Sequence, residues 1–298
     1  MLLKRKALFI INPVSGGKSK HGVPELIDRT LDKVAFEYTI VFSDAAHHAH
    51  IIAKESIGKY DLVVAVGGDG TVNEIASALV GSETVMGILP YGSGNGLSRF
   101  LHIPMDTGAA IRNLDNWRVE AIDAATANGK WFFNMAGMGF DAHIAEVFSH
   151  HVKRGFGSYV KSTLHEIANY KADTYIINID GVEYNHKAFM LSFANSSQYG
   201  NNAHVSPHAS VQDGLLDACI IKPFPLWRFP EMGIRMFTKT SEGSKYVEII
   251  RGKHITVKRD NPGPMHFDGE PSIEGTDIEI NVVPSSLKIL AGISYNKK

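Results

Sequence analysis

A strand, a glycine-rich turn and a helix follow one another in residues 61–79, DLVVAVGGDGTVNEIASAL. The five consecutive apolar residues 62–66 are typical of a strand that is buried on both faces, as in a parallel sheet. A helix is predicted to begin soon after Thr71, so the turn lies at the carboxyl edge of the sheet. Open α/β sheets bind their ligands at that edge. The stretch therefore predicts an α/β domain with a ligand site at residues 67–70.

The same alternation of strands and helices extends over the first part of the chain. Apolar runs predict strands at 6–11, 37–42, 61–66 and 85–89, and helical spacing predicts helices at 23–34, 49–57 and 72–80. Alternating strands and helices favour a parallel sheet with helices on both faces, which is a three-layer α/β domain. We assign residues 1–124 to this domain.

From about residue 125 the pattern changes to short strands separated by glycine, proline and asparagine. Strands are predicted at 174–184, with Asp180-Gly181 as a hairpin turn, and at 187–195, 215–222, 245–250, 254–258 and 278–283. This pattern of short strands and turns predicts a second, mostly antiparallel β domain over residues 125–285. It leaves open that residues 286–298 pack back on the first domain.

Composition and charge exclude several classes of function. The chain carries 30 basic and 31 acidic side chains, a balance that removes the electrostatic attraction on which a general nucleic-acid binder depends. Cys219 is the only cysteine and lies in an apolar run, so a disulfide framework and a cysteine metal site are excluded and a cytoplasmic location is expected. No run approaches the ~18 apolar residues of a membrane span, so any membrane contact is expected to be peripheral.

Two glycine-rich turns are predicted to form one phosphate pocket. In the first, the glycines leave room for phosphate oxygens to approach backbone N–H groups, and the start of the following helix favours anions. Asp69 is tolerable beside phosphate mainly if it faces a metal ion or takes a proton. The second turn, in GILPYGSGNGLSRF of residues 87–100, follows the next strand and repeats the geometry. The predicted nucleotide contacts from these turns are Gly67, Gly68, Gly70, Thr71, Asn73, Glu74, Gly92, Ser93, Gly94 and Asn95.

A third loop, INPVSGGKSK in residues 11–20, comes within one residue of a phosphate-binding P-loop. Asn12 stands where that loop has its first glycine, and Pro13 removes a backbone donor. The loop therefore cannot wrap phosphates as a P-loop does, and we interpret it as a third strand-end loop beside the same site. Its predicted contacts to ribose or phosphate come from Asn12, Ser15, Gly16 and Gly17, with Lys18 as a candidate cation.

The combined motifs resemble the diacylglycerol kinase and sphingosine kinase superfamily of lipid kinases, in its small soluble bacterial form. NPVSGGKS is similar to the family's first nucleotide loop, GGDGTVNE to its signature and LPYGSGN to its third segment, and NMAGMGFDA, QDGLLD and FDGE follow in the expected order over essentially the whole chain. The resemblance implies a nucleotide-binding α/β domain joined to a C-terminal antiparallel β-sandwich, with the active site in the cleft. It implies Mg²⁺-assisted transfer of the ATP γ-phosphoryl group to a lipid hydroxyl, with ATP contacts from Asn12, Ser43, residues 67–73 and Ser93.

The resemblance offers two candidates for the catalytic base. The soluble bacterial kinases point to FDGE, in which Asp268 and Glu270 would lie on the same face of an extended segment. The sphingosine kinase branch points to the aspartate that matches Asp69. A hairpin turn at Asp268-Gly269 is the alternative structural interpretation. We predict that Asp268 and Glu270 form the base region and that Asp69 is the metal or proton partner.

Two further features concern the predicted Mg²⁺. SVQDGLLDA, residues 210–218, is similar to a structural Mg²⁺ loop of the family, with the Asp213 carboxylate and the carbonyls of Ser210 and Leu215 as oxygen ligands. Bacterial diacylglycerol kinases usually read GTxND where this chain reads GSGNG, so Gly96 replaces a family aspartate. Asp141 in GFDA then remains as the metal-site carboxylate. The GSGN motif is more similar to the sphingosine kinase branch of the family.

A lipid substrate requires an apolar path and contact with a membrane surface. Helical spacing in residues 224–239 places apolar side chains on one side and basic side chains on another, namely Phe229, Met232, Met236 and Phe237, and Arg228, Arg235 and Lys239. Such a helix could lie on anionic lipid. A surface helix packed on the β domain is the alternative interpretation.

Other functions stay open from the sequence. NAD kinases and phosphofructokinases share the GGDG turn and would phosphorylate a soluble hydroxyl, although LPYGSGN and FDGE argue against both. A non-catalytic nucleotide or lipid sensor on a kinase fold is a second alternative, for which Gly96 is the hint. The sequence also leaves open whether the lipid is diacylglycerol or a sphingoid base, and whether the chain is a monomer or a homodimer.

Overall fold

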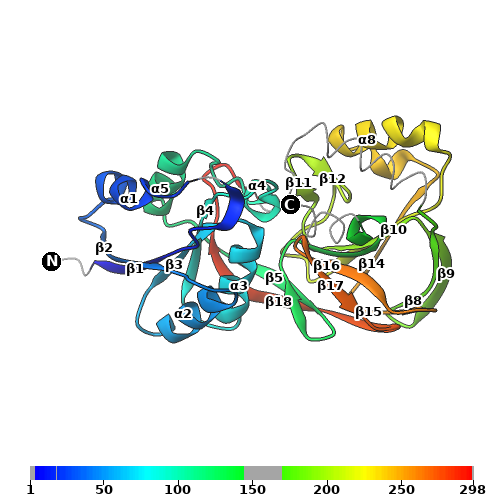
Figure 1. The fold of residues 1–298 in the computed structure, drawn as a ribbon, viewed down its shortest axis with the longest axis horizontal. Coiled ribbons are helices and arrows are strands. Elements are labelled where there is room, and N and C mark those ends of the chain that lie inside the picture. The colour runs from blue at the N-terminus through cyan, green and yellow to red at the C-terminus, as the bar shows by residue number, and fades with distance from the viewer. Residues whose placement is uncertain (1–3, 18, 144–169, 297–298) are drawn as a thin grey trace. The chain divides into compact units, whose positions relative to one another are not determined.

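The computed structural model describes residues 4–17, 19–143 and 170–296 (Figure 1). The chain divides into two compact units. The first unit comprises Met1–Ala124, Ser210–Asp213 and Val283–Lys298, and the second comprises Ala125–Ala209 and Gly214–Val282. Two strands, β5 (Val119–Ala127) and β18 (Asp277–Leu290), run from one unit into the other.

The first unit is built on a parallel sheet. Its strands β1 (Arg5–Ile11), β2 (Phe36–Phe42), β3 (Leu62–Gly67) and β4 (Val85–Pro90) lie in the order β2-β1-β3-β4, and the C-terminal part of β18 pairs with β4 at Ile289 and Met86. Every residue of β3 and β4 is buried, as the unbroken apolar runs predict for strands covered on both faces. Because β1, β3 and β4 are adjacent and parallel, the loops that follow them leave the same edge.

Helices cover both faces of this sheet. The helices are α1 (Val23–Thr30), α2 (His48–Ser56), α3 (Asp69–Leu79), α4 (Gly96–Phe100) and α5 (Thr107–Asp115), and η1 (Ser15–Gly17) is a short 3₁₀ turn. Helices α1 and α5 pack together on one face, and α2 and α3 pack together on the other (Figure 1). Alternate residues of the strands, such as Phe9 and Val64, form one core with Ile27 of α1 and Ile111 of α5. The unit is therefore a three-layer α/β structure.

The second unit is antiparallel. Its strands are β6 (Lys130–Phe132), β7 (Met135–Gly139), β8 (Asp173–Ile179), β9 (Val182–Ala188), β10 (Met190–Ala194), β11 (Gln198–Gly200), β12 (Ala203–His204), β13 (Leu216–Ile221), β14 (Val247–Gly252), β15 (His254–Arg259), β16 (Gly263–Phe267) and β17 (Glu270–Glu274), together with the ends of β5 and β18 that belong to this unit. One sheet has the order β14-β13-β10-β7-β16-β17, and in the other β18, β15, β8 and β9 are neighbours.

Apolar side chains from these two sheets form a single core, in which Ile177 and Val257 of one sheet meet Phe193 and Met265 of the other. This is the packing of a β-sandwich. The hairpin predicted at Asp180-Gly181 joins β8 to β9, and both residues have positive φ, 50° and 91°. The predicted fold class, an α/β unit followed by an antiparallel β-sandwich, is confirmed.

The sandwich unit also carries one helical segment after β13. It consists of η2 (Leu226–Arg228), α8 (Phe229–Phe237) and η3 (Ser241–Gly243). None of the helices in the described ranges is both long enough and apolar enough to span a membrane.

The C-terminal segment is held in the first unit by backbone contacts. The N–H groups of Ala291 and Gly292 donate to the carbonyls of Arg118 and Leu101 at 2.9 and 2.8 Å, and Gly292 is buried. A Cβ atom at Gly292 would overlap the backbone carbonyl of His102. A side chain at this position would therefore push the segment away from the unit.

We predict that Gly292→Ala destabilises the first unit by about 1–3 kcal/mol, because overpacking against backbone cannot be relieved by a rotamer change. Urea unfolding followed by far-ultraviolet circular dichroism measures this loss. Gly108→Ala is the matched control in the same unit, since a Cβ there meets only ordinary contacts. Equal stability of the two variants would contradict the packing described for the C-terminal segment.

Candidate functional site

Three loops of the first unit meet where β1, β3 and β4 end. Gly16 follows β1, Gly68 follows β3 and Gly92 follows β4. A Cβ atom on Gly68 would lie 3.2 Å from Gly92 Cα and 4.0 Å from the backbone nitrogen of Gly16. Gly16 has a φ of 70°, and a Cβ atom there would overlap the carbonyl of Tyr91. The loops thus touch backbone to backbone, which is possible because these glycines have no Cβ atoms.

The Asp69 carboxylate joins the two glycine-rich turns. Its Oδ2 accepts a hydrogen bond from the N–H of Asn95 at 3.0 Å, and its Oδ1 accepts one from the N–H of Gly96 at 3.2 Å. The Asn95 amide in turn bonds both backbone groups of Gly92, at 2.9 and 2.7 Å. The two backbone donors of Asn95 and Gly96 offset part of the Asp69 charge. Its role as metal or proton partner stays a prediction.

Asn12 fixes the first loop to α3. Its Nδ2 donates to Thr71 Oγ1 at 3.1 Å, while its Oδ1 accepts from the N–H groups of Val14 and Ser15 at 3.1 and 3.2 Å. An asparagine can make all these bonds, whereas the glycine of a P-loop could make none. The residue that departs from the P-loop pattern is thus the one that shapes this loop. The candidate cation Lys18 lies outside the described residues.

Lys20 is a buried cation that the sequence did not single out. Only 3% of the residue is exposed, its Nζ donates to the carbonyl of Ser15, and it lies 5.3 Å from the centre of the Tyr91 ring. Burial lowers the pKa of Lys20. Since Gly16 also contacts Tyr91, Lys20 and Tyr91 together hold the first loop in place. No sequence pattern distinguishes Lys20 from the nearby Lys18.

The remaining predicted nucleotide contacts lie around these loops. Ser43 is buried just after β2, and its N–H donates to the carbonyl of Ile11 at 2.9 Å. Ser93 is exposed at the tip of the second turn, and the carbonyl of Gly94 accepts from Arg99 Nε at 3.1 Å. The Glu74 carboxylate accepts from the N–H of His47, at the start of α2. The structure thus brings together the three loops that follow β1, β3 and β4. The Glu74 side chain instead takes part in the contact between α2 and α3.

The FDGE motif of the second unit forms a two-residue hairpin between β16 and β17. Asp268 and Gly269 have φ values of 51° and 93°, and Phe267 pairs with Glu270 across the turn. The interpretation of the motif as an extended segment with both carboxylates on one face is therefore wrong. Two successive residues with positive φ are typical of a type I′ turn, which reverses the chain.

The turn separates the roles of its two carboxylates. Asp268 accepts hydrogen bonds from three backbone N–H groups, those of Phe133, Asn134 and Met135, at 3.0, 2.8 and 2.9 Å. It is half-buried and ties the hairpin to the start of β7. Glu270 is exposed at the first position of β17.

Asp141 lies in a buried polar network of the second unit. Its Oδ2 accepts from Tyr199 Oη at 2.8 Å, from Ser192 Oγ at 3.1 Å and from His266 Nε2 at 3.1 Å. Burial, reinforced by the Asp141 charge, raises the pKa of Tyr199 well above its usual range and keeps this hydroxyl a donor. The other His266 nitrogen, Nδ1, is buried with no partner among the described residues. Sequence reasoning found Asp141 but missed its three partners, because they come from different strands.

The predicted Mg²⁺ loop forms a turn at residues 211–214, in which Gly214 has a φ of 69°. Asp213 is exposed, and Ser210 Oγ accepts from the N–H of Gln212 at 3.3 Å. Within the ranges that the structure describes, no three or more His, Cys, Asp or Glu side chains are placed to hold a metal ion. The metal-ligand roles of Ser210, Asp213, Leu215 and Asp141 stay predictions.

Two family models match the chain and together span most of it. The diacylglycerol kinase catalytic domain matches residues 6–127. The YegS C-terminal NAD kinase beta sandwich-like domain matches residues 134–291. The two matches correspond to the α/β part and the β-sandwich part of the structure.

Similar proteins carry related names. The Chromohalobacter salexigens protein named "Probable lipid kinase YegS-like" is 31% identical over 215 residues, which cover 70% of this chain and 69% of that protein. The crystal structure of a diacylglycerol kinase from Bacillus anthracis superposes with a TM-score of 0.76 at 22% identity, over 98% of each chain. An NAD kinase from Archaeoglobus fulgidus in complex with ATP superposes with a TM-score of 0.55 at 15% identity, over 97% of this chain and 95% of that one. The two superpositions show a shared fold.

We predict that Asp69→Asn loosens the contact between the two glycine-rich turns. An amide offers one acceptor oxygen where two backbone N–H groups need two, so the free energy of unfolding falls by about 1–3 kcal/mol without any nucleotide present. Urea unfolding measures this loss, and calorimetric titration with ATP is expected to show affinity reduced by about tenfold or more. Glu55→Gln, at an exposed position of α2, is the control for loss of a carboxylate. If Asp69→Asn keeps its stability but loses ATP binding, the result would instead indicate that Asp69 contacts the Mg²⁺ bound to ATP.

Proposed function

Because the chain belongs to the diacylglycerol kinase catalytic-domain family of lipid kinases, we propose that it transfers the γ-phosphoryl group of ATP to the hydroxyl of a lipid. The observation that carries this proposal is the backbone contact among the loops at Gly16, Gly68 and Gly92. Such an arrangement places three strand-end loops on one surface, with no Cβ atom between the backbones of these glycines. Phosphoryl transfer depends mainly on such positioning and on offsetting the charge of the phosphoryl oxygens.

The first unit is proposed to bind the triphosphate. The helix α3 begins at Asp69, directly after the turn, so its N-terminal N–H groups and dipole favour an anion there. The Asp69 charge does not oppose this, since it is already shared with the N–H groups of Asn95 and Gly96. Lys20 holds the first loop through the carbonyl of Ser15.

ATP is proposed to enter as its Mg²⁺ complex, so that the cation is part of the substrate. In kinases Mg²⁺ usually keeps several waters and is bound through one or two carboxylates and the substrate phosphates. Asp69 and Asp141 are the carboxylates proposed for contact with this Mg²⁺. Asp213, with the carbonyls of Ser210 and Leu215, is proposed for the separate structural Mg²⁺. No protein cage is required by this chemistry.

The second unit is proposed to supply the base. Glu270 is exposed at the end of a tight hairpin, where its carboxylate can accept the proton of an attacking hydroxyl. Asp268 is a positioning residue, because its carboxylate is engaged by three backbone N–H groups and fixes the turn that carries Glu270. In place of a pair of catalytic carboxylates, we propose Glu270 as the base and Asp268 as the residue that positions it.

The acceptor is proposed to be diacylglycerol or a sphingoid base, both of which offer a primary hydroxyl. An assay with radioactive ATP compares these two lipids, dispersed in detergent, with NAD and a sugar phosphate. Phosphorylation of a lipid alone is expected. Phosphorylation of NAD or the sugar would favour the soluble-hydroxyl alternative, and binding of ATP without transfer to any acceptor would favour the sensor.

We predict that Glu270→Gln lowers lipid phosphorylation by about 10²- to 10⁴-fold, as expected for loss of a general base. Its stability and ATP affinity are expected to stay at the level of the unmodified protein, because the side chain is exposed. Glu183→Gln, at an exposed position of β9, is the control for loss of a carboxylate.

Asp268→Asn is expected to behave differently. Loss of one of its backbone bonds lowers the free energy of unfolding by about 1–3 kcal/mol and lowers activity through the displaced turn. Kinase rates and urea unfolding of both variants measure the contrast. Full stability of Asp268→Asn with complete loss of transfer would reverse the two roles.

A further inference from the structure

The helix α8 is apolar on two opposite faces. Its inner face packs on the sandwich, where Met232 is only 6% exposed and Phe229 and Met236 are partly buried. Its other face is exposed, with Ile234 63% and Phe237 61% accessible. A helix on the surface of a globular protein normally presents polar side chains on the face opposite its core. The exposed apolar face of α8 therefore needs an explanation.

The exposed apolar face continues into the turn before the helix. Leu226 is 53% exposed and Trp227 72% exposed. We call this surface the outer face of α8; it consists of Leu226, Trp227, Pro230, Ile234 and Phe237. Residues 230, 234 and 237 follow the spacing of one helix side. Large exposed apolar patches on protein surfaces mark sites of interaction with a partner or a membrane.

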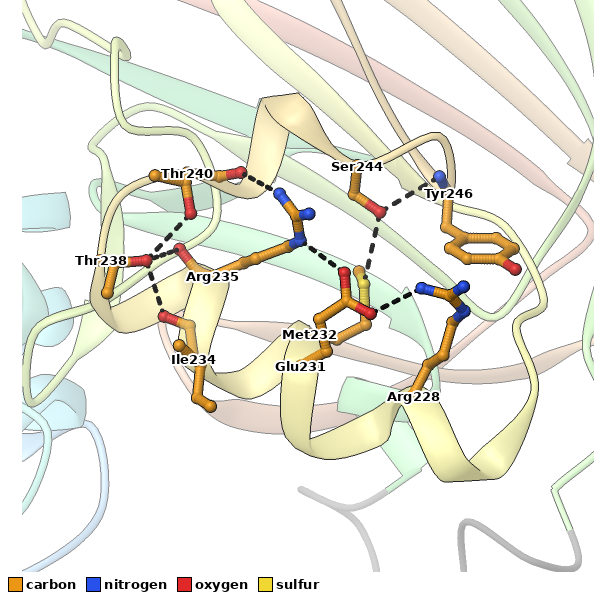
Figure 2. Close-up of polar contacts among 9 residues, drawn as sticks. All are labelled: Arg228, Glu231, Met232, Ile234, Arg235, Thr238, Thr240, Ser244 and Tyr246. Carbon is orange, nitrogen blue, oxygen red and sulfur yellow. Dashed lines mark hydrogen bonds and ion pairs between the residues drawn. The ribbon is translucent and has the colours of Figure 1, made fainter.

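The arginines near the helix are engaged within it. Glu231 accepts from Arg228 Nη1 at 2.7 Å and from Arg235 Nε at 3.0 Å, and Arg235 Nη1 also donates to the Thr240 carbonyl at 3.3 Å (Figure 2). The sequence hypothesis that Phe237 shares one apolar side with Met232 is wrong, because Met232 is 6% and Phe237 61% exposed. Phe237 lies on the side opposite Met232, and the two arginines fix the helix rather than project from it.

The segment that carries the outer face nevertheless contains more basic than acidic residues. Residues 222–246 contain five lysine or arginine side chains and two glutamates, in a chain whose formal net charge is -1. Lys222 is paired with Glu248, and Arg228 and Arg235 are paired with Glu231. Lys239 and Lys245 are exposed, and no carboxylate within the described ranges forms an ion pair with either. Tryptophan, phenylalanine and isoleucine next to unpaired lysines are typical of segments that lie in a lipid interface.

We propose that the outer face of α8 docks on the surface of an anionic lipid bilayer. This inference rests on the proposed lipid kinase function and names the surface through which the enzyme reaches its substrate. The apolar side chains would enter the boundary between headgroups and acyl chains, while Lys239 and Lys245 would meet anionic headgroups. A protein partner or a second copy would not specifically require this excess of positive charge.

The inner face of α8 connects the docking surface to the Asp141 network. Met232 packs in a cluster with Phe140, the residue before Asp141, and Phe229 packs against the same cluster. Met236 packs against a second cluster together with Tyr199, which donates to Asp141. A bilayer bound at the outer face would thus lie on the opposite side of α8 from the side chains that pack near Phe140 and Tyr199.

Cosedimentation with vesicles tests this proposal. The probes are vesicles of phosphatidylcholine mixed with phosphatidylglycerol and vesicles of phosphatidylcholine alone. The unmodified protein is expected to bind the mixed vesicles at least about tenfold more strongly than the neutral ones, and the difference should shrink at high salt. The double variant Ile234→Asn/Phe237→Asn is expected to lose most of this binding, by about tenfold or more.

Controls separate docking from folding. Val34→Asn/Ile293→Asn removes two apolar side chains of comparable exposure, 82% and 72%, from the first unit and should bind as the unmodified protein does. The double variant Lys239→Gln/Lys245→Gln should lose the preference for phosphatidylglycerol. Emission of Trp227 should shift to shorter wavelength with mixed vesicles, and this shift should be absent in Trp227→Phe.

Kinase assays with detergent-dispersed lipid distinguish docking from function. Ile234→Asn/Phe237→Asn should retain the rate of the unmodified protein there and lose activity only on vesicles. If no lipid is phosphorylated but vesicle binding still requires the outer face, the docking surface stands and the proposed function falls. Vesicle binding that is absent in the unmodified protein, or unchanged in this variant, overturns the docking surface. So does a dimer that this variant dissociates, because a second copy would then cover the face.

Discussion

The contact of Gly16, Gly68 and Gly92 is the constraint on which the first unit's proposed chemistry depends. Backbone can approach backbone so closely only where no Cβ atom intervenes, and the contact places three strand-end loops on one surface. Asp69 holds two of these loops together through the N–H groups of Asn95 and Gly96, and Asn12 holds the third to α3. The surface is therefore formed before any ligand is bound, which lowers the entropy cost of binding a triphosphate.

Both units use an aspartate in the same way. Asp69 accepts two backbone N–H groups, and Asp268 accepts three from residues 133–135. Each carboxylate fixes the geometry of a turn: the second glycine-rich turn in the first unit and the hairpin that leads to Glu270 in the second. Rigid support of this kind is what positions groups for phosphoryl transfer. It also explains why an acidic residue can lie next to a site proposed for an anion.

Much of the fold and part of the site follow from the sequence, and the limits have physical causes. Glycine turns after adjacent parallel strands must share one edge, so the meeting of the three loops could be predicted. The partners of Asp268 lie more than 130 positions away along the chain, so no local pattern reveals them. Ser192, Tyr199 and His266 come from three separate strands, so no local pattern reveals them as partners of Asp141 either. Helical spacing in α8 identified apolar side chains but not which of them face the sandwich, because that depends on Phe140 and Tyr199.

Hydrogen exchange followed by mass spectrometry tests most directly whether the three loops form one phosphate site. Amides in residues 12–17, 67–71 and 92–96 are compared with and without Mg²⁺ and ATP. Simultaneous protection of all three segments at the same nucleotide concentration is predicted. Protection of only one segment, or of residues outside all three, would contradict a shared site.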